Sequence, residues 1–213
     1  MKTDDLISML ATGVAPVERH VAAKRFSVAL TFGAMGALAI VIFGYGVRHD
    51  IDILLHAPLF WVKLAWPTCL AVAALAAAVR LGRPGRAVGG WWAGLATPVV
   101  LVWLAALLSL WFAPPGTREH LLMGRTWRSC SFNIAMISLP AFAAALWAAR
   151  SLAPTRLRLT GAVTGLIAGT IGTVAYCLRC PEMSVPFWAT WYLIGMSIPT
   201  AAGALLGPIL LRW

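Results

Sequence analysis

Six apolar runs dominate this chain, and each is long enough to cross a lipid bilayer as a helix. About 20 residues are needed to cross a hydrocarbon core of roughly 30 Å. The runs cover residues 26–46, 58–79, 91–112, 130–149, 159–178 and 187–211. Backbone groups in lipid must bond within a helix or a closed barrel, and the alternation typical of barrel strands is absent. The runs therefore predict an all-α membrane protein with six transmembrane helices in one bundle.

Composition agrees with a chain surrounded by lipid. Hydrophobic residues make up 61% of it and charged residues 11%, whereas a soluble domain carries about 25% charged residues. The net charge of +10 would suggest nucleic acid in a soluble protein. Here the arginines fall in short loops between apolar runs, where they set orientation and meet anionic lipid. We expect the lipid bilayer as a partner, and no direct contact with nucleic acid.

The Lys and Arg residues are divided unequally between the two sets of loops. The set that includes the termini holds 11 of them: Lys2, Arg19, Lys24, Arg25, Arg80, Arg83, Arg86, Arg150, Arg156, Arg158 and Arg212. The other set holds five: Arg48, Arg118, Arg125, Arg128 and Arg179. Because positive residues concentrate on the cytoplasmic side, both termini are predicted to be cytoplasmic. Residues 1–25 then form a cytoplasmic segment, and residues 26–213 form the transmembrane domain.

The amino-terminal segment begins with the pattern of a short amphipathic helix. Thr3 can cap a helix, and Asp4 and Asp5 fall in its first turn, where negative charge is favourable. Leu6 and Leu10 share one face at a helical spacing. Such a helix can lie on the bilayer surface or dock a cytoplasmic partner. Its acidic start disfavours the surface, because surface-binding helices usually carry Lys and Arg on the polar face.

The stretch Tyr176-Cys177-Leu178-Arg179-Cys180-Pro181-Glu182 lies where the fifth apolar run gives way to a polar loop. It gathers two thiols, a cation and a carboxylate at the predicted outer end of a helical hairpin. Cys130 opens the fourth run, so it is predicted to lie at the same boundary. This end of the bundle is therefore the predicted functional site.

These three outward-facing cysteines can form disulfides if the compartment is oxidising. A bridge requires Cα atoms within about 7 Å of each other. Cys177 and Cys180 can close locally only if the helix ends between them, which Pro181 favours because the residue before proline avoids helical geometry. A bridge from Cys130 to Cys180 would instead join two hairpins. The sequence leaves both pairings and the free thiols open.

Three further features allow a functional and a structural interpretation. Lys63 lies near the outer end of the second run, so we expect its stem to reach the interface, with a buried functional lysine as the alternative. Cys69 lies deeper and is expected to be a small buried hydrophobe. The loop 47–57 holds two His and two Asp residues, but their spacing matches no standard metal site, so a solvated loop is expected.

Tryptophan and glycine positions predict how the helices meet lipid and each other. Amphipathic indoles gather at membrane interfaces, which is the role expected for Trp91, Trp92, Trp111, Trp127, Trp188, Trp191 and Trp213. Gly161, Gly165 and Gly169 recur every four residues, and Gly203 and Gly207 do the same in the sixth run. Such small-residue faces let helix backbones approach closely.

Several classes of protein lack their usual signatures in this sequence. There is no Walker motif, HExxH, GxSxG or dinucleotide fingerprint, and no acidic residue lies within an apolar run. Proton and cation relays use such residues, so a pump, a transporter and a membrane hydrolase are disfavoured. What remains is a sensor, a regulator or a thiol redox protein, for which we expect no cofactor and no small-molecule substrate.

The sequence resembles a known family over essentially its whole length. The resemblance rests on the six runs, on Lys2-Thr3-Asp4-Asp5-Leu6-Ile7, and on Cys177-Leu178-Arg179-Cys180-Pro181-Glu182 followed by Trp191-Tyr192. These features resemble the NrsF family, the negative regulators of sigma F. The resemblance implies a multi-pass anti-sigma factor of the bacterial inner membrane, and not an enzyme. It also implies that an extracytoplasmic-function sigma factor is bound by Thr3, Asp4, Asp5, Leu6, Ile7 and Leu10.

The resemblance further implies an outward-facing cysteine pair that senses stress such as heavy metal or oxidant. Cys130 and Cys180 match this pair best by position, with Cys177 as a neighbour. Arg179 stands where many members of the family carry histidine, so no metal ligand set is assigned. A cation beside a thiol favours the thiolate, and we therefore expect Arg179 to make Cys180 more reactive.

An enzyme is the alternative: a quinone-linked membrane thiol oxidoreductase of the DsbB type. It would use a Cys-x-x-Cys at a helix end and a second outward cysteine pair. Beside Cys177 and Cys180 the chain offers only Cys130, because Cys69 is expected to be buried. The electron relay would be incomplete, so we favour the regulator.

Overall fold

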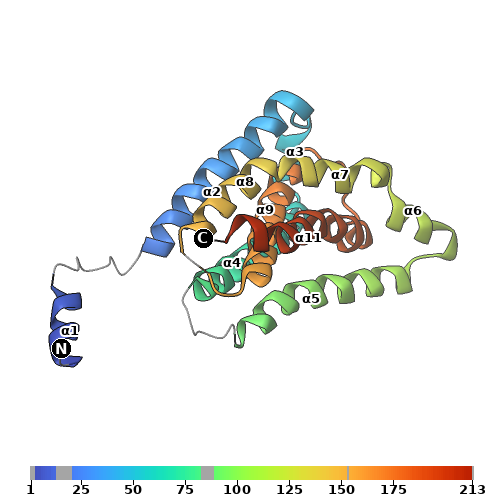
Figure 1. Cartoon of the computed structure of the whole chain (residues 1–213). Helices are drawn as coiled ribbons and strands as arrows, with labels where there is room; N and C mark the ends of the chain where they lie inside the picture. The colour runs from blue at the N-terminus through green and yellow to red at the C-terminus, as the bar shows by residue number, and fades with distance from the viewer. Residues whose placement is uncertain (1–2, 13–20, 83–88, 153, 213) are drawn as a thin grey trace.

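The computed structural model describes residues 3–12, 21–82, 89–152 and 154–212, which form helices and turns with no strand among them (Figure 1). Six helical segments are long and apolar enough to cross a membrane: Ala23–Tyr45, Pro58–Leu81, Trp91–Phe112, Pro115–Arg150, Leu157–Cys177 and Val185–Leu210. The six predicted spans are thus all present as apolar helices.

The spans are built from more than one helix where the backbone changes its winding. The elements in chain order are α1 (Thr3–Ala11), α2 (Val21–Ala39), η1 (Ile40–Tyr45), α3 (Ile51–Leu55), α4 (Pro58–Leu81), α5 (Trp91–Phe112), η2 (Pro115–Thr117), α6 (Arg118–Met123), α7 (Trp127–Ile137), α8 (Leu139–Arg150), α9 (Leu157–Cys177), α10 (Val185–Phe187), η3 (Trp188–Tyr192) and α11 (Leu193–Leu210). η1 and η3 are π-helical and η2 is a 3₁₀ turn.

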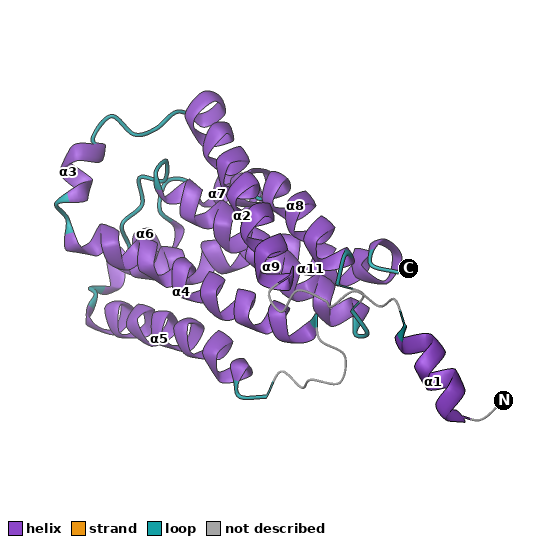
Figure 2. Ribbon diagram, turned by 90° about the vertical axis from the view of Figure 1, so that its left-hand side faces the viewer, coloured by secondary structure: helices purple, strands orange, loops and turns teal. Residues whose placement is uncertain are grey.

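α9 is the central helix of the bundle. Fourteen of its 21 residues are buried, and it packs against α11, α4, α8, α7 and α2 (Figures 1 and 2). α5 is the opposite case, because only Val102 and Ala106 are buried among its 22 residues. It runs along one edge of the bundle (Figure 2), where Leu101, Leu104, Leu107 and Leu108 are exposed. The bundle is therefore organised around a helix rich in Gly and Thr, with a leucine-rich helix at its periphery.

The glycine ladders make the tightest contact in the protein, between α9 and α11. A methyl group on Gly161 would overlap the carbonyl of Gly203, and one on Gly165 would overlap the carbonyl of Pro199. A methyl group on Gly207 would in turn overlap the carbonyl of Leu157. The prediction of close helix packing from these glycines is confirmed, and α9 and α11 meet backbone to backbone.

The fourth span is broken near its middle. α7 ends at Ile137 and α8 begins at Leu139, with Pro140 in its first turn, where a missing N–H is tolerated. Ser138 at the break is buried and donates its hydroxyl to Ile134 O at 2.6 Å. The preceding loop also differs from the sequence prediction, because it contains η2 and α6, and α7 begins three residues before Cys130.

Two buried apolar clusters fill the bundle. The first surrounds the cysteines and includes Ile134, Tyr176, Trp188 and Tyr192. The second includes Phe26, Leu81, Leu146, Ile167 and Leu211. α4 and α9 contribute to both clusters, so they connect the cysteine end of the bundle with the opposite end.

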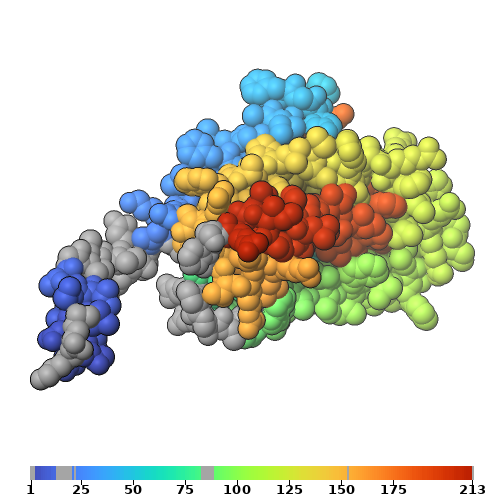
Figure 3. Space-filling model, in the orientation of Figure 1, coloured from blue at the N-terminus to red at the C-terminus, as the bar shows by residue number. Residues whose placement is uncertain are grey.

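The predicted amino-terminal helix is present as α1. Each of its residues is exposed, and it stands apart from the spans (Figure 3). Residues 13–20, the middle of the predicted cytoplasmic segment, lie outside the described residues. α1 therefore presents its side chains without a partner within the described chain.

Candidate functional site

The structure brings the three predicted cysteines to one end of the bundle. Cys130 comes from α7, Cys177 is the last residue of α9, and Cys180 lies in the segment 178–184, which we call the cysteine loop. All three are free thiols, and Cys130 and Cys180 interact through a hydrogen bond between their side chains. Cys177 points instead toward Lys63 O, at 3.9 Å. Cys130 and Cys180 thus form a pair, with Cys177 beside it.

The three cysteines are buried, although thiols at the end of the bundle were expected to be within reach of solvent. The exposed fraction of each of the three is 0%. The aromatic side chains of Phe187, Trp188 and Tyr192 belong to the same buried cluster. The sequence placed the thiols at the correct end of the helices, but it did not show that the following helix covers them.

The end of α9 explains how Cys180 turns inward. The N–H groups of Arg179 and Cys180 both bond to Tyr176 O, at 2.9 Å each, which closes one last turn. Pro181 has no N–H to continue the helix. Cys180 is therefore directed back into the bundle, while the chain leaves toward α10.

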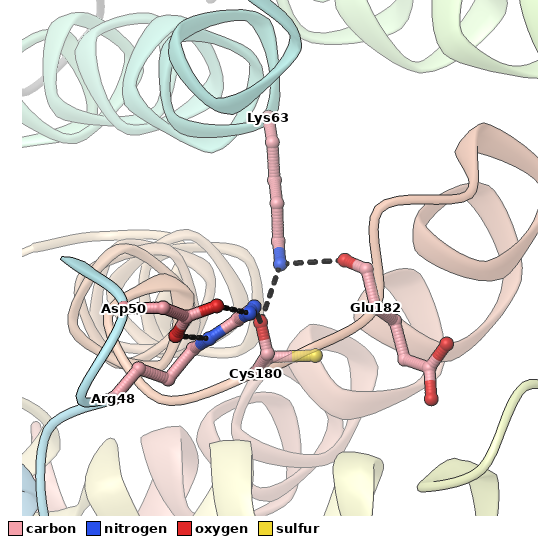
Figure 4. Close-up of polar contacts among 5 residues, drawn as sticks. All are labelled: Arg48, Asp50, Lys63, Cys180 and Glu182. Atoms are coloured by element: carbon pink, nitrogen blue, oxygen red, sulfur yellow. Dashed lines mark hydrogen bonds and ion pairs between the residues drawn. The ribbon is translucent and has the colours of Figure 1, made fainter. Parts of the chain in front are cut away.

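Lys63 is the central cation of this site, and the sequence expectation that it reaches the membrane interface is wrong. Its side chain is fully buried, and Nζ donates to Cys180 O at 3.0 Å and to Glu182 O at 2.7 Å (Figure 4). The rings of Trp188 and Tyr192 lie 5.9 and 5.7 Å from Nζ, within the range of a cation–π contact. The lysine thus fastens the cysteine loop to α4.

Burying an ammonium group is unfavourable unless a negative charge compensates it. Among the described residues, no carboxylate pairs with Lys63, whose partners are the two carbonyls and the two rings. The thiol of Cys180 can supply the charge as a thiolate. The Tyr192 hydroxyl is buried beside the same thiols and interacts with the side chain of Cys180.

The surroundings of Cys180 favour its ionised form. The hydrogen bond from Cys130 is the largest cause that lowers the pKa of Cys180 to about 6, and the charge of Lys63 acts in the same direction, while burial opposes both. These surroundings therefore favour the thiolate, the reactive form of cysteine, more than water does. The charge that favours the thiolate comes from Lys63, and not from Arg179 as we expected from the sequence.

The cysteine loop is tied to several segments that are distant in sequence. Arg48 donates through Nη1 to Cys180 O at 3.3 Å and forms a two-point ion pair with Asp50 (Figure 4). The Glu182 carboxylate accepts the N–H of Arg125 at 2.7 Å, and the hydroxyl of Ser184 donates to a carbonyl of α6 at 2.7 Å. A rearrangement of the cysteine loop would therefore affect its bonds to all three of these segments.

Gly124 lets the α6–α7 turn approach Glu182. Its φ of 56° lies in the left-handed region, which residues other than glycine rarely adopt. A methyl group there would also lie 2.7 Å from Glu182 Cδ and 2.9 Å from the ring of Phe187. The turn therefore depends on glycine for both its conformation and its fit against the cysteine loop.

The π-helical element η3 places aromatic side chains around Lys63. π-Helical turns often occur at functional sites, and η3 directs Trp188 and Tyr192 into the bundle. Trp188 is 1% exposed, so its expected role as an interface anchor is wrong. Trp191 is partly buried, packs against the tilted ring of Trp127 with ring centres 5.3 Å apart, and donates to Leu122 O.

The structure also settles which thiols can act together. Cys69 is exposed on α4, which corrects the expectation of a buried residue and leaves it unpaired with the other three. A DsbB-type oxidoreductase would need a second thiol pair, which this arrangement does not supply. Within the described ranges, no group of three His, Cys, Asp or Glu side chains is arranged to hold a metal ion. The site offers two thiols in contact, and not a three-ligand metal centre.

The residues predicted to bind a partner lie elsewhere. Thr3, Asp4, Asp5, Leu6, Ile7 and Leu10 all lie on α1 and are exposed. The structure does not bring them to the cysteines. Sequence reasoning missed the roles of Lys63, Trp188, Tyr192 and Gly124. In the structure Lys63 shares the buried face of α4 with Phe60, Pro67 and Leu70, but the run is apolar on every side, so the sequence alone did not mark this face.

Six helices long and apolar enough to cross a membrane, a buried thiol pair at one end of the bundle and one exposed amino-terminal helix indicate a multi-span membrane protein. Residues 10–213 match the family described as negative regulator of sigma F, and the chain belongs to this NrsF family.

Two curated relatives agree with this assignment over the full length of both chains. The chain is 48% identical to a probable anti-sigma-F factor NrsF from Azospira oryzae. It is 35% identical to the anti-sigma-F factor NrsF from Caulobacter vibrioides. No solved structure is similar. The resemblance seen in the sequence is thereby confirmed.

Proposed function

We propose that this protein is a membrane-bound anti-sigma factor of the bacterial inner membrane. It sequesters an extracytoplasmic-function sigma factor through α1 and has both termini in the cytoplasm. It releases the sigma factor when a heavy metal or an oxidant reacts with Cys130 and Cys180. The names of its relatives support the anti-sigma role, and the buried thiol pair beside Lys63 supports the sensing role.

The observation that carries the sensing proposal is the buried ammonium of Lys63, which binds the backbone of Cys180 and lowers the pKa of its thiol. A soft divalent metal ion would bind both sulfurs and displace the proton of Cys130, since soft ions prefer thiolate ligands. A two-electron oxidant would join the two sulfurs, take up two electrons, and leave the Cys130 proton to solvent. Either reaction removes the negative charge near Lys63. The buried ammonium then lacks compensation, which favours a rearrangement of the cysteine loop.

α1 suits a binding role because its apolar residues are uncovered. Leu6 is 42% exposed and Leu10 is 68% exposed, while Asp4 and Asp5 lie in the first turn. Burying one leucine against a partner contributes roughly 1.5–3 kcal/mol. A partner with an apolar groove and basic residues at its edge would therefore gain from covering this helix.

Leu6→Asp or Leu10→Asp should release the sigma factor while the protein stays folded in the membrane. The substitution removes apolar burial at the partner and would force a charge into that contact. Co-purification of the sigma factor with the full-length chain measures the effect, and Ser8→Ala is the control on the same helix. Undiminished co-purification with Leu6→Asp would show that α1 is not the binding element.

Cys130→Ser or Cys180→Ser should leave sigma-factor binding intact and remove the response to thiophilic metal or oxidant. The two single variants should resemble the double variant, because residues that act as one unit are not additive. Cys177→Ser should have a partial effect, and Cys69→Ser should behave as the wild type. A reporter driven by the sigma factor reads all of these variants. Full induction in the Cys130 and Cys180 double variant would end the sensing proposal and leave the binding proposal standing.

A further inference from the structure

A polar pocket of about 200 Å³ opens beside the thiol pair. It lies between the segment that carries Arg48, the start of α7 and the cysteine loop. Its wall includes Arg48, Arg179, Thr126, Ser129 and Asn133. The two apolar pockets between the spans are lined by side chains of the kind that lipid tails contact. This pocket differs from them because hydrogen-bond donors gather in it.

Positive charge in this pocket exceeds negative charge. Arg48 is paired with Asp50 and also donates to Cys180 O. Arg179 lies exposed at the rim. Its backbone N–H bonds to Tyr176 O, but within the described residues its guanidinium group has neither a hydrogen bond nor an ion pair. A guanidinium group offers five N–H donors in a planar fork that matches carboxylate and phosphate oxygens. The pocket thus has one uncommitted guanidinium and a second that is only partly engaged.

A buried hydroxyl without a partner lies in the same wall. Thr126 Oγ1 is buried, and the described part of the chain supplies no hydrogen-bond partner for it. Leaving such a group unpaired is unfavourable by about 1–3 kcal/mol. Thr126 also directly precedes α7, and the amino-terminal end of a helix favours negative charge. A ligand with several acceptor oxygens would satisfy the hydroxyl and the arginines together.

We propose that this pocket binds a small tetrahedral oxyanion of the sulfate or phosphate class, either free or as the phosphate of a lipid headgroup. The inference rests on the proposed sensing function, to which it adds an effector. Arg48 connects the pocket to Cys180 O, and Tyr176 in its wall interacts with Cys130. An oxyanion held by Arg48 and Arg179 steadies the cysteine loop and slows access to the thiols.

The test uses the full-length protein in neutral detergent without phospholipid. Thermal unfolding is followed in sodium sulfate, in sodium phosphate and in sodium chloride at equal ionic strength. The midpoint should rise saturably with sulfate or phosphate and not with chloride, and alkylation of Cys180 should slow in parallel. Equal behaviour in all three salts would overturn the proposal.

Matched variants separate a built site from general salt effects. Arg179→Met should abolish the sulfate response and Thr126→Val should weaken it, since each removes a donor from the pocket. Arg128→Met makes the same charge change at an exposed residue that stacks on Trp127 outside the pocket, and it should keep the response. If the Arg179→Met variant responds to sulfate as strongly as the wild type does, the proposed site is wrong.

The source of the anion is distinguished in nanodiscs. If the ligand is a free ion, sulfate raises the midpoint in nanodiscs as it does in detergent. If a headgroup phosphate occupies the pocket, the nanodisc protein starts with the higher midpoint, gains nothing from sulfate, and loses this advantage with Arg179→Met. The sigma factor is co-purified in the same experiments. If the thiols still control release of the sigma factor but no anion effect is seen, the anion-binding proposal alone is overturned. If the anion effect is seen but the sigma factor does not bind, the proposed function alone is overturned.

Discussion

The two ends of α9 are held in the bundle by different means. Near Gly161 and Gly165 its backbone touches the backbone of α11, with no room for a side chain between them. Near Cys177 and Cys180 it is held by long side chains, above all Lys63, that reach across from other helices. One helix thus carries a contact that is fixed by shape and a contact that is fixed by charge.

This difference indicates which half of the bundle can rearrange when a side chain is ionised or oxidised. A backbone contact depends on packing, which neither pH nor oxidation alters, and tightly packed interiors resist small displacements. The contact at the cysteine end depends on the charge of Cys180, whose pKa is lowered to about 6 by Cys130 and Lys63. We expect the glycine end to act as the fixed support and the cysteine end to rearrange against it.

The largest effect is expected from Gly165→Ala, which attacks the fixed end. The added methyl group would overlap Pro199 O and press on Thr200 Cα, so the two helices must separate. Overpacking of this kind destabilises by about 3 kcal/mol, which thermal unfolding in detergent detects. Gly116→Ala is the control, because a methyl group at Gly116 meets nothing within 4 Å. Equal midpoints for both variants would show that the backbone contact is not tight.

Lys63→Met attacks the other end and should have a smaller effect on stability. It removes the charged donor shared by Cys180 O and Glu182 O, which keep only their bonds from Arg48 and Trp188, and this loss is unfavourable by about 1–3 kcal/mol. It also leaves the Cys180 thiolate without its cation. Adding Cys180→Ser to Lys63→Met should therefore recover part of the loss, so the two substitutions are not additive. Strict additivity in this double-mutant cycle would argue against a charge contact.

The third prediction concerns pH. The folded pKa of Cys180, about 6, lies below the value of about 8.5 for an unperturbed thiol. Ionised Cys180 therefore contributes stability that is fully present above about pH 8.5 and is lost as the pH falls through about 6. The difference in unfolding midpoint between the wild type and Cys180→Ser should therefore shrink as the pH falls through this range. A constant difference across it would mean that Cys180 does not titrate in the folded protein.

The smallest change in stability is expected from Glu182→Gln, which tests a single charged contact of the cysteine loop. Gln keeps an acceptor for the N–H of Arg125 but loses the charge that strengthens this bond. We expect a loss of about 1 kcal/mol, which corresponds to roughly fivefold faster opening of the loop. The alkylation rate of Cys180 under native conditions measures it. Unchanged alkylation would show that Glu182 does not hold the loop closed.

The parts of the fold that depend on local composition were predictable from the sequence. Six apolar runs give six spans, because a lipid environment permits little else for such runs. The glycines Gly161, Gly165 and Gly169 predicted the tight helix contact, because such a contact requires only that one face of the helix carries no side chains. Neither inference required knowing which helix lies beside which.

The parts of the site that depend on long-range neighbours were not predictable. Lys63 and Cys69 both lie in a run that is apolar on every side, so the sequence does not tell which face points inward. We placed Lys63 at the interface and Cys69 in the interior, and the structure has Lys63 buried and Cys69 exposed. The pairing of Cys130 with Cys180 came from the family resemblance, because they are 50 residues apart in the sequence.

The burial of the thiol pair also determines which agents can reach it. With Cys130 and Cys180 fully covered, the closed site acts as a sieve that admits agents by size. Peptide thiols and redox proteins carry their reactive sulfur on bulky bodies, so they cannot approach a sulfur that lies behind Phe187 and Trp188. Metal ions and small peroxides can follow a brief opening of the loop. We therefore expect the same cover to hinder thiol exchange with proteins and to admit metal ions and small peroxides.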